Sequence, residues 1–138
     1  MNRRTILILE DDDDRLTGFQ RAVASLGGDF VVRIWRHAPT MIADCPACFA
    51  KARMISLDHD LEGVGGEPDP ATGLDVAKFL SLHAPLCPVI LHTSNFDGRL
   101  AMQNRLRAGG WTVATVPPRE ADWIQALWLP IARRLIGF

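Results

Sequence analysis

Polar side chains that could do chemistry follow three apolar runs of the chain. Glu10 opens five consecutive acids after TILIL, and Asp58 and Asp60 come directly after RMISL. A third run, PVIL, is followed by His92, Thr93, Ser94 and Asn95. Carboxylates that meet at close range repel one another unless a cation lies between them or one of them takes up a proton. Because Mg²⁺ favours carboxylate, water and phosphate oxygens, the pattern predicts a site for Mg²⁺ or another divalent cation that handles a phosphate group.

Each residue type in these runs has an expected role. Asp58 and Asp60 can face one way in an extended chain, because side chains alternate along it. We expect the metal ligands among Glu10, Asp11, Asp58 and Asp60. We expect the phosphate contacts from Thr93, Ser94, Asn95 and Arg15. The catalytic candidates are Asp58, His59, His92 and Thr93; a histidine titrates near neutral pH and can act as general acid or base, although either one could instead make a structural hydrogen bond.

The elements that must position these residues alternate along the chain. Apolar and β-branched runs predict strands over residues 5–10, 30–35, 53–58, 88–93 and 111–116. Helical spacing predicts helices over residues 12–26, 38–52, 73–83, 97–108 and 119–136, the last kinked at Pro130. Residues 62–72, rich in Gly and Pro, predict a loop that covers the site.

Strands that alternate with helices through short connections predict an α/β fold with a parallel sheet and helices on both faces. Ligands of such sheets bind at the carboxyl ends of the strands, near the point where the strand order reverses. Glu10, Asp58 and His92 all lie at such ends. The fold therefore brings together acids that are far apart in the sequence.

Composition sets further expectations. The chain has 138 residues, which predicts a single domain over residues 1–138, and a net charge of −1, which does not favour a strong nucleic-acid patch. No apolar run is long enough for a signal peptide or a membrane span. Three cysteines leave one over from any pairing, so we expect a cytoplasmic protein. Cys45 and Cys48 form a lone CxxC, for which redox or zinc chemistry is a minor alternative.

The sequence resembles the receiver domains of response regulators over essentially its whole length. ILILEDD is similar to their first strand and acidic pair, Asp58 stands at the phosphate-accepting position, and Thr93 at the hydroxyl position. The resemblance implies a flavodoxin-like or CheY-like, doubly wound five-stranded sheet in the order 2-1-3-4-5 with five helices. Receivers carry a Lys-Pro after the fifth strand, whereas this chain has Val116-Pro117-Pro118.

The departures from ordinary receivers form a pattern of their own. The segments EDDDDR, SLDHDL, TGLDVAKFL and HTSN resemble the divergent group of cyclic-phosphate-processing receiver domains. This resemblance implies that the partner is a phosphate-containing small molecule or nucleotide, such as a cyclic phosphate or an RNA end.

Three functions stay open. The first is a metal-dependent phosphoesterase that acts on cyclic phosphates. The second is a signalling receiver that is phosphorylated on Asp58 in a phosphorelay, which the missing Lys disfavours. The third is a non-catalytic pseudo-receiver that binds a protein partner, or a second copy, through the apolar residues of the last helix.

Overall fold

The five predicted strands form one parallel sheet in the order β2-β1-β3-β4-β5 in a computed structural model that describes residues 2–137. The strands are β1 (Thr5–Leu9), β2 (Val31–Trp35), β3 (Ala52–Leu57), β4 (Val89–Leu91) and β5 (Val113–Thr115). The doubly wound α/β fold and the strand order 2-1-3-4-5 are therefore confirmed.

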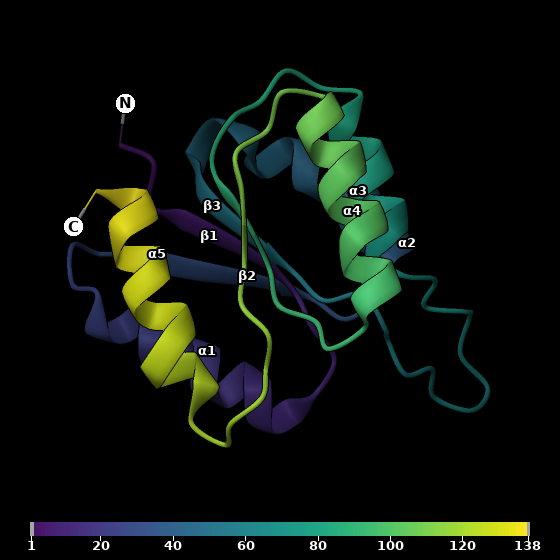
Figure 1. Ribbon diagram of the computed structural model, residues 1–138, viewed down its shortest axis with the longest axis horizontal. Helices are drawn as coiled ribbons and strands as arrows, with labels where there is room; N and C mark the ends of the chain where they lie inside the picture. The colour runs from purple at the N-terminus through teal and green to yellow at the C-terminus, as the bar shows by residue number, and fades with distance from the viewer. Residues whose placement is uncertain (1, 138) are drawn as a thin grey trace.

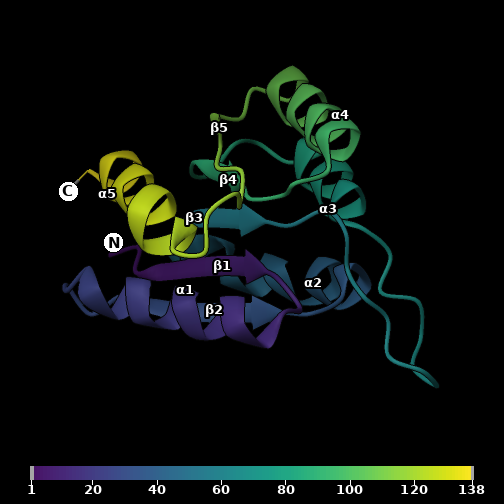
Figure 2. The same ribbon diagram turned by 60° about the horizontal axis from the view of Figure 1, so that its bottom comes forward.

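Helices cover both faces of the sheet (Figures 1 and 2). The helices are α1 (Asp13–Ser25), α2 (Ala38–Asp44), α3 (Gly73–Ser81), α4 (Phe96–Ala108) and α5 (Leu129–Ile136). Ile6 and Ile8 pack with α1 and α5, whereas Leu7 and Leu9 pack with α2, α3 and α4, because successive side chains of a strand point to opposite faces. None of the helices formed by residues 2–137 has the length and apolar character to cross a membrane.

The predicted helix over residues 38–52 is wrong in its second half. α2 ends at Asp44, and a 3₁₀ helix, η1 (Cys45–Lys51), takes its place. Pro46 has no N–H with which to continue the α-helical hydrogen bonds, so the chain tightens instead. Cys45 lies buried in this turn, and burial raises the pKa of its thiol to about 12. A thiol with so high a pKa forms little of the thiolate that redox chemistry requires.

The predicted last helix is also corrected. Residues 119–122 lie outside it, and the helical part opens with a π-helix, η2 (Ile124–Trp128), that leads into α5. The backbone N–H of Leu129 reaches back to the carbonyl of Ile124. Pro130 lies in the first turn of α5, and the missing N–H of a proline would leave an α-helical ladder incomplete at that point. The predicted kink therefore takes the form of one wide turn next to Pro130.

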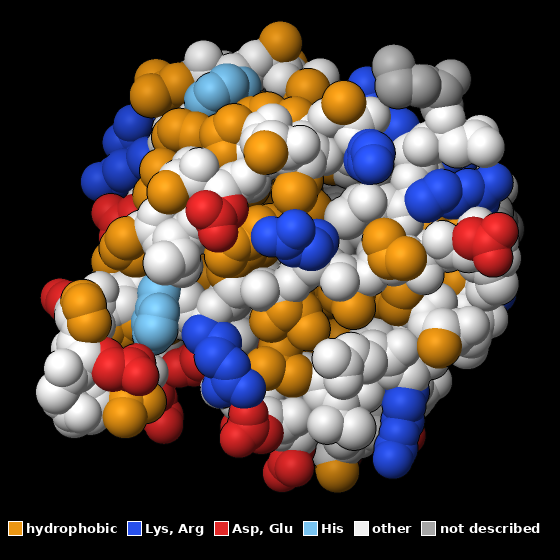
Figure 3. All heavy atoms as spheres, turned by 180° about the vertical axis from the view of Figure 1, so that it is seen from behind, with side chains coloured by type: hydrophobic (Ala, Val, Ile, Leu, Met, Phe, Trp, Pro, Cys, Tyr) orange, Lys and Arg blue, Asp and Glu red, His pale blue; other side chains and the backbone are white. Residues whose placement is uncertain are grey.

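The loop between β3 and α3 projects from the carboxyl edge of the sheet (Figures 1 and 2). The backbone N–H of Ala38 donates to the carbonyl of Pro70 at 2.9 Å, and His37 Nε2 lies 3.5 Å from Glu67 Oε2. In Figure 3 the surface is hollowed beside the loop, and acidic, basic and histidine side chains gather there. The loop thus stands at one side of the predicted site and is tied to the start of α2.

Candidate functional site

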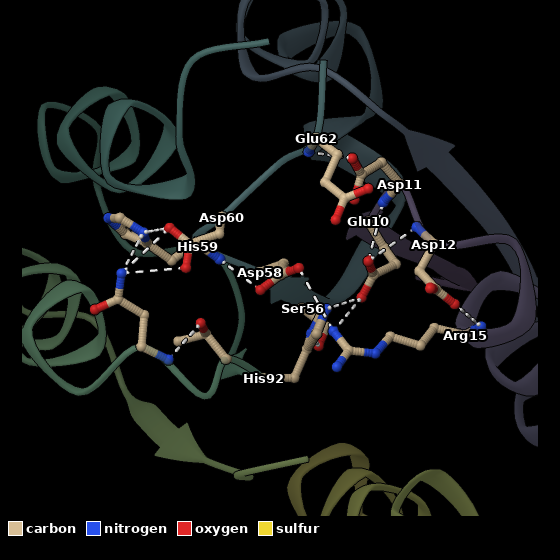
Figure 4. A network of polar contacts seen from close by, with 12 residues as sticks. Glu10, Asp11, Asp12, Arg15, Ser56, Asp58, His59, Asp60, Glu62 and His92 are labelled. Atoms are coloured by element: carbon tan, nitrogen blue, oxygen red, sulfur yellow. Dashed lines mark hydrogen bonds and ion pairs between the residues drawn. The ribbon is translucent and has the colours of Figure 1, made fainter. Parts of the chain in front are cut away.

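The alternation of the strands places four polar residues on the sheet face that α1 and α5 cover. Glu10 follows Ile8 by two residues, Asp58 follows Ser56 by two, and His92 follows Ile90 by two. Glu10 and His92 have no exposed surface, and Asp58 is 5% exposed. Parallel strands end at the same edge, so these side chains meet, with Asp58 at the centre of Figure 4.

Glu10 and Asp58 form a buried pair of carboxylates with one cation beside them. Ligand atoms of Glu10, Asp58 and His92 lie within 4.8 Å of one another. Arg15 Nη1 lies 3.5 Å from Glu10 Oε1 and 3.7 Å from Asp58 Oδ2. The guanidinium of Arg15 also lies 5.5 Å from the ring centroid of Trp123, a cation–π distance. Arg15 therefore supplies a positive charge from the first turn of α1.

A chain of hydrogen bonds leads from the core to Glu10. The indole Nε1 of Trp128 donates to Ser56 Oγ at 3.0 Å, Ser56 Oγ lies 2.7 Å from His92 Nδ1, and His92 Nε2 lies 3.1 Å from Glu10 Oε1. Within residues 2–137, His92 Nδ1 is the acceptor available to the Ser56 hydroxyl proton. His92 then carries its proton on Nε2 and donates it to the carboxylate. We call Trp128, Ser56, His92 and Glu10 the buried hydrogen-bond chain.

Burial and neighbouring charges separate the pKa values of these groups. Burial lowers the pKa of His92, which favours the neutral imidazole. Burial alone would raise the pKa of Glu10, but hydrogen bonds from His92 and the backbone N–H of Asp12 lower it overall. Burial, and then the charge of Glu10, raise the pKa of Asp58 to about 7. The repulsion between the two carboxylates therefore appears in the raised pKa of Asp58, while Glu10 keeps a lowered pKa.

Asp11 completes an open hollow above this pair. The hollow, here called the acidic cavity, has a volume of about 200 Å³ and is lined by Glu10, Asp11, Asp12, Arg15, Asp58, Asp60 and Glu62. The backbone N–H of Glu62 donates to Asp11 Oδ2, while Asp12 caps α1 by accepting from the N–H of Arg15 at 2.9 Å. Burial raises the pKa of Asp11. Carboxylates of this kind are the donors that a hard divalent cation prefers.

Other predicted site residues gather on the opposite side of Asp58 (Figure 4). His59 Nδ1 lies 2.8 Å from Asp60 Oδ1, and Asn95 Nδ2 donates to both Asp60 oxygens at 3.2 Å. Thr93 Oγ1 accepts from the backbone N–H of Asn95 at 3.1 Å. The side chain of Asp60 is thus drawn toward His59 and Asn95 although Asp60 still lines the acidic cavity. His59 and His92 lie in separate groups.

Ser94 lies apart from the carboxylates. It lines a second hollow, here called the cationic cavity, with a volume of about 170 Å³, together with Thr93, Phe96, Arg99, Pro117 and Arg119. Val116, where receivers carry Lys, is 1% exposed and packs in the core. The cation nearest to the carboxylate pair is therefore Arg15 on α1 rather than a residue after β5.

Sequence reasoning missed three residues of this region. Ser56 is a polar residue inside an apolar strand, and such a residue signals a buried hydrogen bond. The sequence does not indicate that Trp128 reaches the site, because its hydrogen bond to Ser56 depends on how the last helix packs on the sheet. Glu62 acts through its backbone N–H, which is invisible in a residue pattern.

Residues 6–108 match the family described as the cyclic-phosphate processing receiver domain. The chain belongs to this family. The resemblance to receiver domains is thereby confirmed. A comparison with curated proteins gave no match.

Several solved structures with a similar fold are described as response regulators or their receiver domains. A phosphorylated cyanobacterial phytochrome response regulator, RcpA, is 16% identical with a TM-score of 0.74, covering 98% of this chain and 95% of that one. The response regulator domain of Thermotoga maritima CheB is 14% identical with a TM-score of 0.66, covering 97% and 96%. A receiver domain from Rhodospirillum rubrum is 20% identical with a TM-score of 0.62, covering 96% and 90%. These identities establish the fold alone.

Proposed function

We propose that this receiver domain binds a divalent cation in the acidic cavity and processes a cyclic phosphate of a nucleotide or an RNA end. The observation that carries the proposal is the buried pair of Glu10 and Asp58, with Arg15 Nη1 3.5 Å and 3.7 Å from their oxygens. Two carboxylates and one guanidinium leave a net negative charge, which a divalent cation would offset. The description of the family points to the same class of substrate.

The donor set fits Mg²⁺. Asp11 and Asp58 are the residues that would hold the ion, because Glu10 already accepts hydrogen bonds on both of its oxygens. Glu10 would contribute its charge from behind them. A bound divalent ion polarises a phosphoryl oxygen and offsets charge in the transition state. Oxygen donors of this kind suit a hard cation.

The residues around the ion would orient the phosphate, position Glu10 and accept a proton. Arg15 would orient a phosphate oxygen, in place of the Lys that ordinary receivers use. His92 would act as a positioning residue, because it is fully buried and both of its ring nitrogens face protein atoms. His59 is then the better general base, because Asp60 Oδ1 lies 2.8 Å from Nδ1 and residues 2–137 provide no hydrogen bond to Nε2, which can therefore exchange protons.

Opening of a cyclic phosphate follows from these roles. The oxygen of a water molecule bonds to phosphorus, and the bond from phosphorus to one ribose oxygen breaks. His59 would accept the proton that the water loses, and the departing ribose oxygen would take a proton from solvent. Thr93 and Asn95 would help to hold the phosphate near the end of β4. Ser94, which lines the cationic cavity, would contact the substrate beyond the scissile phosphate.

Hydrolysis of adenosine 2′,3′-cyclic phosphate in millimolar Mg²⁺ tests the proposal. We expect turnover in the parent protein, loss of turnover in Asp58→Asn, and a fall of roughly 100-fold or more in His59→Gln. Glu120→Gln, an exposed change outside the site, is the matched control. Unchanged turnover in Asp58→Asn, or no binding of a divalent cation at millimolar concentration, would falsify the proposal.

A second candidate is phosphorylation of Asp58. Asp58 follows β3 and Thr93 follows β4, which is the arrangement that the receiver resemblance implies for the phosphate acceptor and its hydroxyl partner. Incubation with acetyl phosphate and Mg²⁺ would then add one phosphoryl group to the parent protein and none to Asp58→Ala. Mass spectrometry of the intact protein distinguishes this outcome from turnover without a covalent adduct.

The third candidate is a pseudo-receiver that binds a protein partner or forms a homodimer through its last helix. Most of the apolar residues of that helix are buried in the core, among them Trp128, Leu129 and Ile136. Leu127 is 39% exposed and offers the main apolar contact on η2. We therefore place this candidate below the other two. We also propose that residues 1–138 form a single receiver-like domain and that the protein acts in the cytoplasm.

A further inference from the structure

The cationic cavity differs in chemistry from the acidic cavity. It lies between the start of α4 and the chain that follows β5. Its lining contains two arginines, an aromatic ring and two hydroxyls, and no carboxylate. A hollow with this lining attracts an anion.

The arginines of this cavity are available to a ligand. Within residues 2–137, neither Arg99 nor Arg119 forms an ion pair with a carboxylate. Arg119 is exposed and Arg99 is half-buried. A guanidinium can present two parallel N–H donors to a phosphate, which makes arginine well suited to phosphate recognition.

Phe96 gives the cavity an aromatic wall. It is 63% exposed and belongs to neither of the two hydrophobic core clusters. The guanidinium carbon of Arg99 lies 5.1 Å from the centroid of its ring. Stacking on an aromatic side chain binds nucleobases of any sequence, and an adjacent arginine adds a cation–π contribution. Phe96 thus presents its ring to solvent, where a planar ligand can stack on it.

The cavity lies about one nucleotide away from the carboxylates. Leu57, Leu91 and Thr115 are in register across β3, β4 and β5. Neighbouring strands are about 4.8 Å apart, so the end of β5 lies roughly 10 Å from the end of β3, where Asp58 lies. A nucleotide with a phosphate at Asp58 can therefore reach Phe96 and Arg119 with its base and its other phosphate.

We infer that the cationic cavity binds the base and a second phosphate of a nucleotide whose reacting phosphate lies in the acidic cavity. The base stacks on Phe96, and the second phosphate pairs with Arg99 and Arg119. This inference rests on the proposed function and narrows it: the substrate carries a 5′-phosphate, as the terminal nucleotide of a strand does. A nucleoside cyclic phosphate without that group is the poorer ligand.

Calorimetric binding of two uncleavable probes tests the inference. 2′-Deoxyadenosine 3′-phosphate carries one phosphate, 2′-deoxyadenosine 3′,5′-bisphosphate carries two, and inorganic phosphate has no base to stack on Phe96. With Mg²⁺ present, we expect Phe96→Ala to weaken binding of both nucleotides about 5- to 100-fold and to leave inorganic phosphate unchanged. We expect Arg119→Gln to abolish the preference for the bisphosphate, about 10-fold or more.

Leu100→Ala is the matched control, because Leu100 lies on the same helix, is 43% exposed and does not line the cavity. Unchanged nucleotide binding in Phe96→Ala overturns the inference. If Phe96→Ala changes self-association on sedimentation but does not change nucleotide affinity, the inference is also overturned. That outcome would make this surface a contact between two copies. If Asp58→Asn still hydrolyses adenosine 2′,3′-cyclic phosphate as the parent protein does while Phe96→Ala still weakens binding of the nucleotides, the proposed function fails and the cavity stands as a nucleotide site.

Discussion

At the scale of single residues, the site depends on a carboxyl group that is placed unfavourably. Asp58 is 5% exposed and has Glu10 beside it, and the guanidinium of Arg15 lies 3.5 Å from an oxygen of Glu10 and 3.7 Å from an oxygen of Asp58. Burial and the charge of Glu10 raise its pKa from 3.8 to about 7. A group with a raised pKa in the folded state binds a proton that the unfolded chain has released, so stability falls as the pH rises between those two values.

Asp58→Asn should therefore stabilise the protein in the absence of divalent cations. The amide is uncharged at every pH, so above pH 7 we expect the free energy of unfolding to increase by up to about 4 kcal/mol, since each pKa unit is worth about 1.4 kcal/mol, and below pH 4 we expect the difference to vanish. Denaturant unfolding in EDTA across this range measures it, with Glu120→Gln as control. A less stable variant at pH 8 would show that Arg15 outweighs the repulsion.

The buried hydrogen-bond chain makes a second prediction at this scale. Ser56→Ala removes the group that accepts from Trp128 and lies 2.7 Å from His92 Nδ1, leaving two buried polar atoms without a partner. We expect a loss of about 2 kcal/mol in the free energy of unfolding. We also expect a change in the tautomer of His92, visible in the ¹⁵N chemical shifts of its ring.

Thr112→Ala, at an exposed position, controls for the loss of a hydroxyl. An unchanged His92 spectrum in Ser56→Ala would mean that Glu10 alone fixes the ring. The prediction separates positioning from proton transfer, because it is read on His92 itself and needs no substrate.

At the scale of elements, close packing of helices on the strand ends fixes the groups around Asp58. Gly98 in α4 touches the ring of His59, and a Cβ at this position would lie 2.5 Å from ring carbons. The ring of His59 is held in turn by Asp60 and Asn95. The start of α4 thus serves as a rigid wall for the proposed general base.

Gly98→Ala should push His59 out of its place. The gain in helix propensity, about 1 kcal/mol, opposes an overpacking cost of about 1–3 kcal/mol, so we expect a net loss near 1 kcal/mol. The turnover rate should fall by a larger factor than this loss of stability alone would cause. Gly65→Ala, where a Cβ would meet nothing within 4 Å, is the control. Normal turnover in Gly98→Ala would argue against His59 as the base.

The elements also show how far a sequence can be interpreted. The alternation of strands and helices was enough to predict that Glu10, Asp58 and His92 gather at the carboxyl edge of a parallel sheet, whereas the strand order 2-1-3-4-5 was implied by the resemblance to receiver domains. The 3₁₀ turn at Pro46 and the π-turn before Pro130 were not predicted, since they depend on local repair of missing backbone hydrogen bonds. The direction of Asp60 depends on Asn95, which only the folded chain brings close.

At the scale of the whole molecule, folding assembles the acidic cavity from the ends of separate strands. Asp11 follows β1 and Asp58 follows β3, so an unfolded chain cannot hold an ion between them. A cation that binds only the folded protein stabilises it in proportion to the logarithm of its concentration. We expect saturating Mg²⁺ to raise the free energy of unfolding by about 1–3 kcal/mol.

Thermal unfolding with and without Mg²⁺ measures this gain. The gain should disappear in Asp58→Asn and in Asp11→Asn, and it should persist in Asp97→Asn, an exposed acid on α4. An equal gain in all of these proteins would point to general screening of surface charge instead of a specific ion.

The packing around Arg15 also affects the fluorescence of the protein. The chain has four tryptophans, and two of them lie against the site: Trp123 under the guanidinium of Arg15, and Trp128 at the inner end of the buried hydrogen-bond chain. A ligand that moves Arg15 changes the charge above one indole, and a ligand that shifts Glu10 changes the hydrogen bond of the other. The intrinsic fluorescence of the protein should therefore serve as an optical sensor of its own occupancy, without any added dye.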